Sequence, residues 1–169
     1  MIKKIVLMGN PNVGKSVVFT RLTGANVISS NYPGTTVDFS KGKMRLDGNT
    51  VEIIDAPGTY SIEPSNKAEE VASDLFKDAD IIINVIDSTN LERNLYLTLQ
   101  LLETGIPLIL DLNMIDAAKH KGIEIDVRYL EELLKVPVVC TVAISGEGIK
   151  DLHRAIKKTI SRITFEKES

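Results

Sequence analysis

The 169-residue chain is predicted to be an α/β domain with a mostly parallel six-stranded sheet, one antiparallel edge strand and helices on both faces. Three observations predict this class. Short apolar runs typical of buried strands alternate with segments of helical periodicity. The first apolar run leads into a glycine-rich loop and then a helix, and a short glycine-containing link joins two other runs. The length is that of one ordinary domain.

The strand-like runs are short and rich in Ile, Val and Leu, as expected for parallel strands buried on both faces. A run at Lys43–Leu46 is joined to the next by Asp47-Gly48-Asn49. This link is typical of a hairpin and predicts that Lys43–Leu46 is the antiparallel edge strand. The other five runs lie at Ile5–Met8, Val51–Ile54, Ile81–Ile86, Pro107–Leu112 and Val138–Val142.

Segments between the later strands carry the periodicity of amphipathic helices, which places helices on both faces of the sheet. Thr89-Asn90-Leu91-Glu92 has the pattern of a capping box at a helix start. We expect one domain over residues 1–164 and a polar tail over residues 165–169. The predicted helices lie at Ser16–Leu22, Lys67–Lys77, Leu91–Glu103, Val127–Lys135 and Ile149–Ile163.

Composition excludes several classes of protein. The net charge of −3 gives no reason to expect a nucleic-acid partner. The single cysteine, Cys140, lies in an apolar run and cannot form a disulfide framework. No stretch approaches the roughly 20 apolar residues of a membrane helix. We therefore expect this chain to be soluble, with a sizeable core built from its 43% hydrophobic residues.

The sequence GNPNVGKS has the pattern of a phosphate-binding loop, with a strand before it and a helix after it. Glycines let the backbone turn tightly and direct successive N–H groups at a phosphate, and the helix adds the positive end of its dipole. Lys15 supplies a charge for the outer phosphates, and Ser16 supplies a hydroxyl for Mg²⁺. The expected phosphate-binding residues are Gly9, Asn10, Pro11, Asn12, Val13, Gly14, Lys15, Ser16 and Val17.

A second loop of interest, Asp55-Ala56-Pro57-Gly58, follows another strand. Open parallel sheets bind ligands outside the carboxyl ends of their strands. Asp55 at such an end can hold Mg²⁺ through a water, and the Gly58 amide can bond a terminal phosphate. Taken alone, the same residues are also compatible with an ordinary Pro-Gly turn.

The base is predicted to be guanine because of the loop Asn113-Met114-Ile115-Asp116. The Asp116 carboxylate can accept two hydrogen bonds from donors that guanine has and adenine lacks. Asn113 is expected to tie this loop back to the phosphate-binding loop. After the last strand come Val142 and Ala143, where we expect the Ala143 N–H to meet the guanine carbonyl.

The order GNPNVGKS, Thr35-Thr36, DAPG and NMID resembles the small-GTPase superfamily, which implies a Ras-like P-loop GTPase fold. Asn31–Thr36, Pro57–Ser61 and Asp87–Leu97 further resemble the FeoB family, prokaryotic ferrous-iron transporters with an N-terminal GTPase domain. The resemblance implies binding of GTP and GDP with Mg²⁺ and hydrolysis of GTP. In such relatives a helical domain and a membrane region follow on the same polypeptide. We expect a fragment whose full-length form lies at the cytoplasmic face of the cell membrane.

The resemblance also implies roles in the reaction. Many GTPases orient the attacking water with a glutamine after the D-x-x-G glycine, and here Thr59 stands there. We therefore expect slow intrinsic hydrolysis. Asn12 matches an asparagine with which related families hold K⁺, and it is equally compatible with a turn-forming asparagine. The residues expected to hold Mg²⁺ are Ser16, Thr36 and Asp55, and those expected to act in catalysis are Lys15, Thr36, Gly58 and Asn12.

Two residues depart from the pattern. Met114 replaces the usual lysine of N-K-x-D, so we expect modest GTP affinity. Asp111 interrupts a buried strand. We expect either that burial raises the pKa of this carboxyl group or that the group forms a hydrogen bond near the loop Asn113–Asp116. The alternatives to an iron-transporter domain are a ribosome-assembly or RNA-modification GTPase and a nucleotide-sensing interaction module. The sequence leaves a homo-oligomer open.

Overall fold

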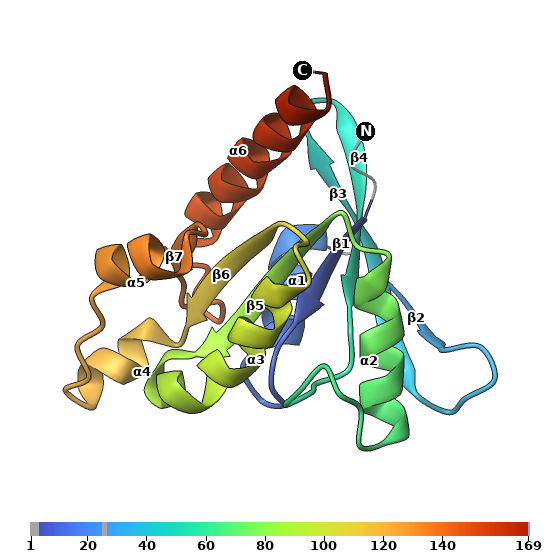
Figure 1. Cartoon of the computed structure of the whole chain (residues 1–169), viewed down its shortest axis with the longest axis horizontal. Helices are drawn as coiled ribbons and strands as arrows, with labels where there is room; N and C mark the ends of the chain where they lie inside the picture. The colour runs from blue at the N-terminus through green and yellow to red at the C-terminus, as the bar shows by residue number, and fades with distance from the viewer. Residues whose placement is uncertain (1–3, 25–26, 169) are drawn as a thin grey trace.

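The computed structural model describes residues 4–24 and 27–168. Its centre is a seven-stranded sheet in the order β2-β3-β4-β1-β5-β6-β7 (Figure 1). Strand β1 pairs in parallel with β4 and β5, and β6 and β7 continue the parallel part. The strands are β1 (Lys4–Met8), β2 (Val27–Asn31), β3 (Asp38–Leu46), β4 (Asn49–Asp55), β5 (Ile81–Asp87), β6 (Leu108–Asn113) and β7 (Val138–Cys140).

The predicted mostly parallel α/β sheet is confirmed, but the strand count and the edge were wrong. Strand β3 starts at Asp38, and β2 pairs antiparallel with it from the outside, so the antiparallel strand is not the edge. All five residues of β2 are exposed. A strand without a buried face has no alternating pattern in its sequence, which is why Val27–Asn31 was missed.

Helices cover both faces, as predicted. The described helices are α1 (Lys15–Thr23), α2 (Lys67–Lys77), the 3₁₀ turn η1 (Ser88–Asn90), α3 (Leu91–Glu103), α4 (Ile115–His120), α5 (Val127–Leu134) and α6 (Ile149–Glu168). The short α4 was not predicted. Helix α6 continues to Glu168, so residues 165–168 of the segment expected to be a polar tail form its last turn, and Ser169 lies outside the described residues.

Two hydrophobic cores lie on opposite faces of the sheet because successive strand residues point in opposite directions. In β1, Ile5 and Leu7 pack with residues of α1 and α6, whereas Val6 and Met8 pack with residues of α2, α3 and α5. The two cores hold the strands in fixed register. The carboxyl ends of β1, β4, β6 and β7 therefore present their loops along one edge of the sheet, where the motifs lie.

Candidate functional site

The loop between β1 and α1 forms a concave turn. Asn12 and Gly14 both have left-handed backbone conformations, with φ of 64° and 83°. The Gly14 carbonyl accepts hydrogen bonds from Val17 and Val18, which begins α1 directly after the turn. Asn10 to Val17, together with Gly58, line a cavity of about 420 Å³. Eight of the nine residues predicted to bind phosphate thus line one hollow, and the ninth, Gly9, directly precedes them in the chain.

Gly14 also has to lack a side chain. A Cβ built on Gly14 would lie 2.4 Å from Nδ2 of Asn113. That nitrogen donates to the Val13 carbonyl at 2.9 Å. The loop after β6 is thereby tied to the phosphate-binding loop, the link expected of Asn113, and the close approach needs glycine at residue 14.

Three polar side chains meet at the floor of the loop. The Lys15 ammonium donates to the Asp55 carboxylate and to the Ala56 carbonyl. The Ser16 hydroxyl donates to the other Asp55 oxygen at 2.8 Å. Lys15 and Asp55 are both nearly buried, and the register Leu7↔Asp55 places the carboxylate beside the end of β1. The arrangement combines a fixed cation with two adjacent oxygen ligands, a donor set that suits Mg²⁺.

The DAPG loop packs directly on the phosphate-binding loop. A Cβ on Gly58 would lie 2.9 Å from Cα of Pro11. The Thr59 N–H donates to the Gly9 carbonyl at 3.0 Å, and its hydroxyl donates to the Ser61 carbonyl at 2.6 Å. Thr59 is buried. Its side chain is therefore hydrogen-bonded within its own turn.

Thr36, a predicted Mg²⁺ ligand, is not brought to the cavity. It lies in the turn between β2 and β3, exposed to solvent, and does not line the cavity. The neighbouring Thr35 hydroxyl is used within the turn, donating to the Tyr32 carbonyl and accepting from the Val37 N–H. Of the two threonines, Thr36 has the side chain free of this turn.

The loop Asn113–Asp116, called the guanine loop after its predicted role, leads from β6 into α4. Met114 adopts a left-handed conformation, with φ of 58°, and starts α4, whose first turn holds the exposed Asp116. The Ala143 N–H was expected to meet a guanine carbonyl, but it donates to Oδ1 of Asn113 at 3.0 Å. The Val142 N–H is also occupied, by the Glu147 carbonyl.

Asp111 is fully buried, and the sequence did not reveal its partner. The Thr141 hydroxyl lies 2.6 Å from Oδ1 of Asp111. Burial raises the pKa of Asp111 to about 7, and the hydrogen bond from Thr141 opposes this rise in part. Thr141 follows β7 directly and looked like an ordinary strand residue, so only the register Asp111↔Val139 reveals the pair.

Side chains of helix α3 contact the segment after Gly58. The Arg93 guanidinium lies over the Tyr60 ring, 4.8 Å from its centroid, and Gln100 accepts from the Ile62 N–H at 3.1 Å. These contacts give Arg93 and Gln100 a role that core packing alone does not. They connect the DAPG loop to the helix whose sequence most resembles FeoB.

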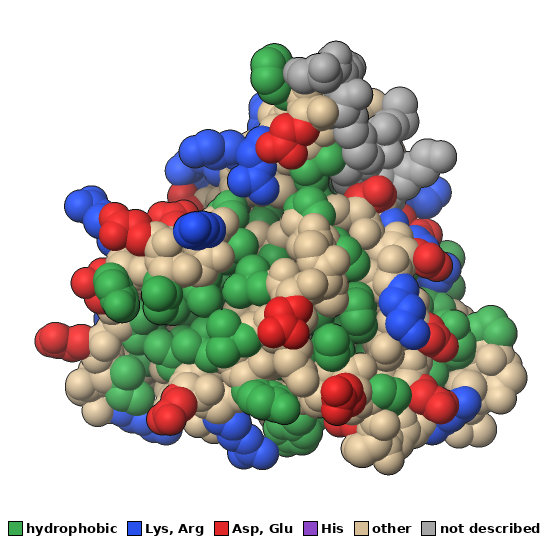
Figure 2. Space-filling model, in the orientation of Figure 1, with side chains coloured by type: hydrophobic (Ala, Val, Ile, Leu, Met, Phe, Trp, Pro, Cys, Tyr) green, Lys and Arg blue, Asp and Glu red, His purple; other side chains and the backbone are tan. Residues whose placement is uncertain are grey.

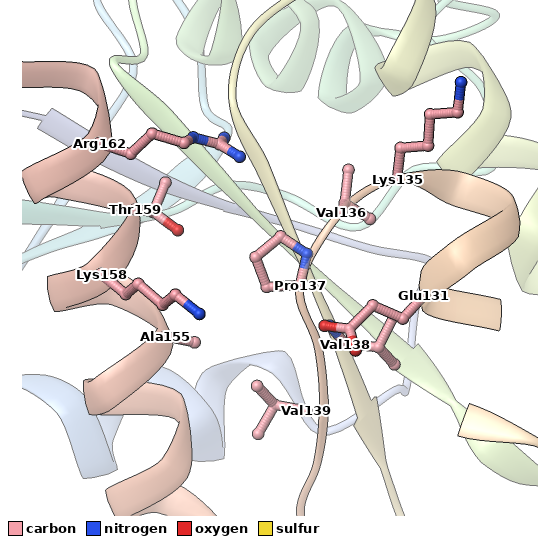
Figure 3. Close-up of a pocket in the computed structure, with 10 residues that line it drawn as sticks. All are labelled: Glu131, Lys135, Val136, Pro137, Val138, Val139, Ala155, Lys158, Thr159 and Arg162. Atoms are coloured by element: carbon pink, nitrogen blue, oxygen red, sulfur yellow. The ribbon is translucent and has the colours of Figure 1, made fainter. Parts of the chain in front are cut away.

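Two other surface features lie away from these motifs. Figure 3 shows a larger cavity, about 550 Å³, where α6 faces the β7 strand and the end of α5. No predicted site residue lines it. Hydrophobic side chains also gather around α3 and α5 (Figure 2), where Tyr96, Leu99, Tyr129 and Leu133 are exposed.

Over residues 4–24 and 27–168, no helix combines the length and the apolar character needed to cross a bilayer. Within the same residues, no group of three or more His, Cys, Asp or Glu side chains is arranged to hold a metal ion.

The fold and the loop define a class of protein, the Ras-like P-loop GTPase domains. The family model for ferrous iron transport protein B matches residues 3–156. This chain belongs to the FeoB family, of which it represents the N-terminal domain, and the resemblance seen in the sequence is confirmed.

Individual similar proteins support the same family membership. The Fe(2+) transporter FeoB of Salmonella typhimurium is 46% identical over 160 residues, which is 91% of this chain and 21% of that protein. The chain therefore spans about a fifth of that relative's length. The FeoB G-domain from Methanococcus jannaschii is 42% identical with a TM-score of 0.82, covering 94% of this chain and 97% of its own. The cytosolic domain of T. maritima FeoB in its GMPPNP form is 42% identical with a TM-score of 0.87. The match covers 93% of this chain and 63% of that domain.

Proposed function

We propose that this domain binds GTP and GDP with Mg²⁺, hydrolyses GTP slowly, and regulates a ferrous-iron transporter from the cytoplasmic side of the membrane. The observation that carries the proposal is the cluster of Lys15, Ser16 and Asp55 beneath a loop of backbone amides. A fixed cation, two oxygen ligands and a helix N-terminus together form a site for polyphosphate and Mg²⁺.

Solved structures of a relative support the proposal that the ligand is a guanine nucleotide. The T. maritima cytosolic domain has been solved in GDP and GMPPNP forms. In this chain the Asp116 carboxylate is exposed at the start of α4 and would select guanine by accepting from its two donors. Because the Ala143 N–H is used by Asn113, the next amide is the better candidate for the guanine carbonyl. The Ile144 N–H has no hydrogen bond within the described part of the chain.

Ser16, Asp55 and Thr36 would hold Mg²⁺, which neutralises phosphate charge when bound. Ser16 and Asp55 are already adjacent, whereas Thr36 has to come from the β2–β3 turn. We therefore infer that the segment Asn31 to Asp38 rearranges when GTP binds, as switch segments of GTPases do. Asn12 lines the cavity in a left-handed turn, and we include it as the K⁺ ligand of the proposal.

Slow hydrolysis follows from what surrounds Gly58. The Thr59 hydroxyl is donated to the Ser61 carbonyl, so no side-chain amide orients the attacking water there. A coupling route to the rest of the transporter starts at the same loop, through Tyr60 on Arg93 and Ile62 on Gln100 of α3. Downstream helical and membrane domains are the proposed partners. Membership of the FeoB family does not favour the ribosome-assembly alternative.

Phosphate release from GTP tests the proposal. We expect slow turnover that requires Mg²⁺ and is lost in Lys15→Ala, with Lys158→Ala as a control that changes an exposed lysine of α6. Turnover that is absent from the unmodified domain, or that is equal with ATP, contradicts the proposal.

A further inference from the structure

Asp111 is a carboxyl group for which the proposed reaction has no use. It is fully buried in β6, between β5 and β7. One of its oxygens, Oδ1, accepts from the Thr141 hydroxyl, and the other, Oδ2, has no hydrogen bond partner among the described residues. A buried carboxylate oxygen without a partner is destabilising, so the group favours its neutral form.

The same hydroxyl touches the guanine loop. Thr141 Oγ1 lies 2.6 Å from Oδ1 of Asp111 and 3.2 Å from Oδ1 of Asn113. A hydroxyl has one proton and can donate to only one of these oxygens at a time. Asn113 in turn accepts from the Ala143 N–H at 3.0 Å and donates to the Val13 carbonyl at 2.9 Å. Contacts at hydrogen-bond distance therefore extend from Asp111 through Thr141 and Asn113 to the phosphate-binding loop.

The surroundings leave Asp111 dependent on Thr141. Its neighbours across the sheet are Val85 and Val139. Asp111 lies on the same face of β6 as Ile109, which packs in the core formed with α1 and α6. The titratable and charged groups on the two paired strands and on the described parts of these helices are Asp87, Cys140, Lys15, Arg21, Lys150, Asp151, His153, Arg154, Lys157, Lys158, Arg162 and Glu166. None of these forms a hydrogen bond or ion pair with Asp111 in the described structure. Burial raises the pKa of Asp111 to about 7. Burial first, and then the nearby Asp111 when it is charged, raise the pKa of the Cys140 thiol.

We propose that Asp111 and Thr141 form a proton-dependent positioning pair behind the guanine loop, with the protonated carboxyl strengthening nucleotide binding. This inference rests on the proposed nucleotide binding. Asp111 touches no nucleotide and acts only through Thr141 and Asn113.

The direction follows from the single hydroxyl proton. When Asp111 is protonated, its O–H can donate to Thr141, and the Thr141 O–H is then free to donate to Asn113. The Asn113 carbonyl oxygen is held by two donors, which fixes its amide toward Val13. When Asp111 is ionised, its carboxylate accepts the hydrogen bond from the Thr141 hydroxyl, and the Asn113 carbonyl oxygen keeps only the Ala143 N–H as a donor.

The expected effect is that of one neutral hydrogen bond gained or lost, which is about fivefold in affinity. Since the pKa of Asp111 is about 7, most of the change falls across neutrality. We expect GDP to bind about threefold more weakly at about pH 8 than at about pH 6 through this group alone.

Calorimetric titration of Mg²⁺–GDP at these two pH values tests the pair. Asp111→Asn keeps the shape and a permanent donor but cannot ionise, and it should remove the threefold contribution from the pH dependence while binding tightly. Thr141→Val breaks the chain with a side chain of the same shape. It should also remove that contribution and bind about fivefold more weakly at low pH. The pH dependence left in Asp111→Asn measures all other groups, including the nucleotide phosphates.

Three results separate the possibilities. An identical pH dependence in the unmodified domain and in Asp111→Asn overturns the pair and leaves nucleotide binding standing. A Thr141→Val variant with the unmodified pH dependence overturns the route through Thr141, and this variant decides the matter if Asp111→Asn does not fold. If the folded unmodified domain does not bind GDP at either pH, the proposed function itself has failed.

Discussion

Replacing Asp111 by Asn should stabilise the folded domain, increasingly so as pH rises. The carboxyl has no exposed surface, one hydroxyl donor and an oxygen without a described partner. Asparagine keeps the size of the side chain and carries no charge. The comparison therefore isolates the free energy of ionising this group inside the sheet, which needs no nucleotide for its measurement.

The magnitude follows from the pKa. Burial raises the pKa of Asp111 from its ordinary 3.8 to about 7. Below the lower value both folded and unfolded states hold the proton. Between the two values only the folded state holds it, so stability falls as pH rises, and above the higher value the loss is complete. At about 1.4 kcal/mol for each tenfold change in acidity, the full loss is about 4 kcal/mol, as an order of magnitude.

Urea unfolding at about pH 5 and about pH 8 measures this effect. The stability advantage of Asp111→Asn over the unmodified domain should widen by about 3 kcal/mol between the two pH values. Asp116→Asn is the matched control, because Asp116 is an exposed aspartate in the first turn of α4, and its stability difference is the baseline against which the change for Asp111→Asn is measured. An advantage for Asp111→Asn that is the same at both pH values would show that burial does not hold the proton on Asp111, and would refute the reasoning.

Further predictions concern the loops. Asp116→Asn should move the preference from guanosine to xanthosine diphosphate by at least about tenfold, measured by competition, since the carboxylate accepts two donors of guanine; an unchanged preference would remove the base assignment. Gly14→Ala should destabilise the domain by about 2 kcal/mol in thermal or urea unfolding, because it combines a left-handed backbone with a clash against Asn113, whereas Gly105→Ala, with open space around its Cβ, should show only the backbone part. Hydrolysis should be faster in K⁺ than in Na⁺, and equal rates would leave Asn12 a turn-forming residue.

The parts of the fold that could be predicted were those with a buried pattern. Strands such as Ile81–Ile86 can be recognised from the sequence because the residues on both faces are mostly apolar. The helices beside them can be recognised because their apolar residues recur with helical periodicity. Strand β2 could not be found in this way, since it buries nothing. It is held by backbone pairing to β3, and backbone pairing leaves no pattern of apolar side chains in its own sequence.

The candidate site also has parts that could be predicted from the sequence and parts that could not. The phosphate-binding loop is a contiguous segment whose geometry is set by its own glycines, so GNPNVGKS was sufficient to predict it. Long-range partners were not predictable: Thr141 meets Asp111 only because β6 and β7 pair in one register. The Ala143 amide was misassigned because a backbone N–H carries no signal of which acceptor it will meet.

The most direct test of the central claim is calorimetric titration of the folded domain with GDP and with ADP in the presence of Mg²⁺. We predict saturable binding of one GDP per domain and no binding of ADP at the same concentrations. Absence of GDP binding, or equal affinity for both nucleotides, would contradict the account of a phosphate-binding loop coupled to a carboxylate that selects guanine.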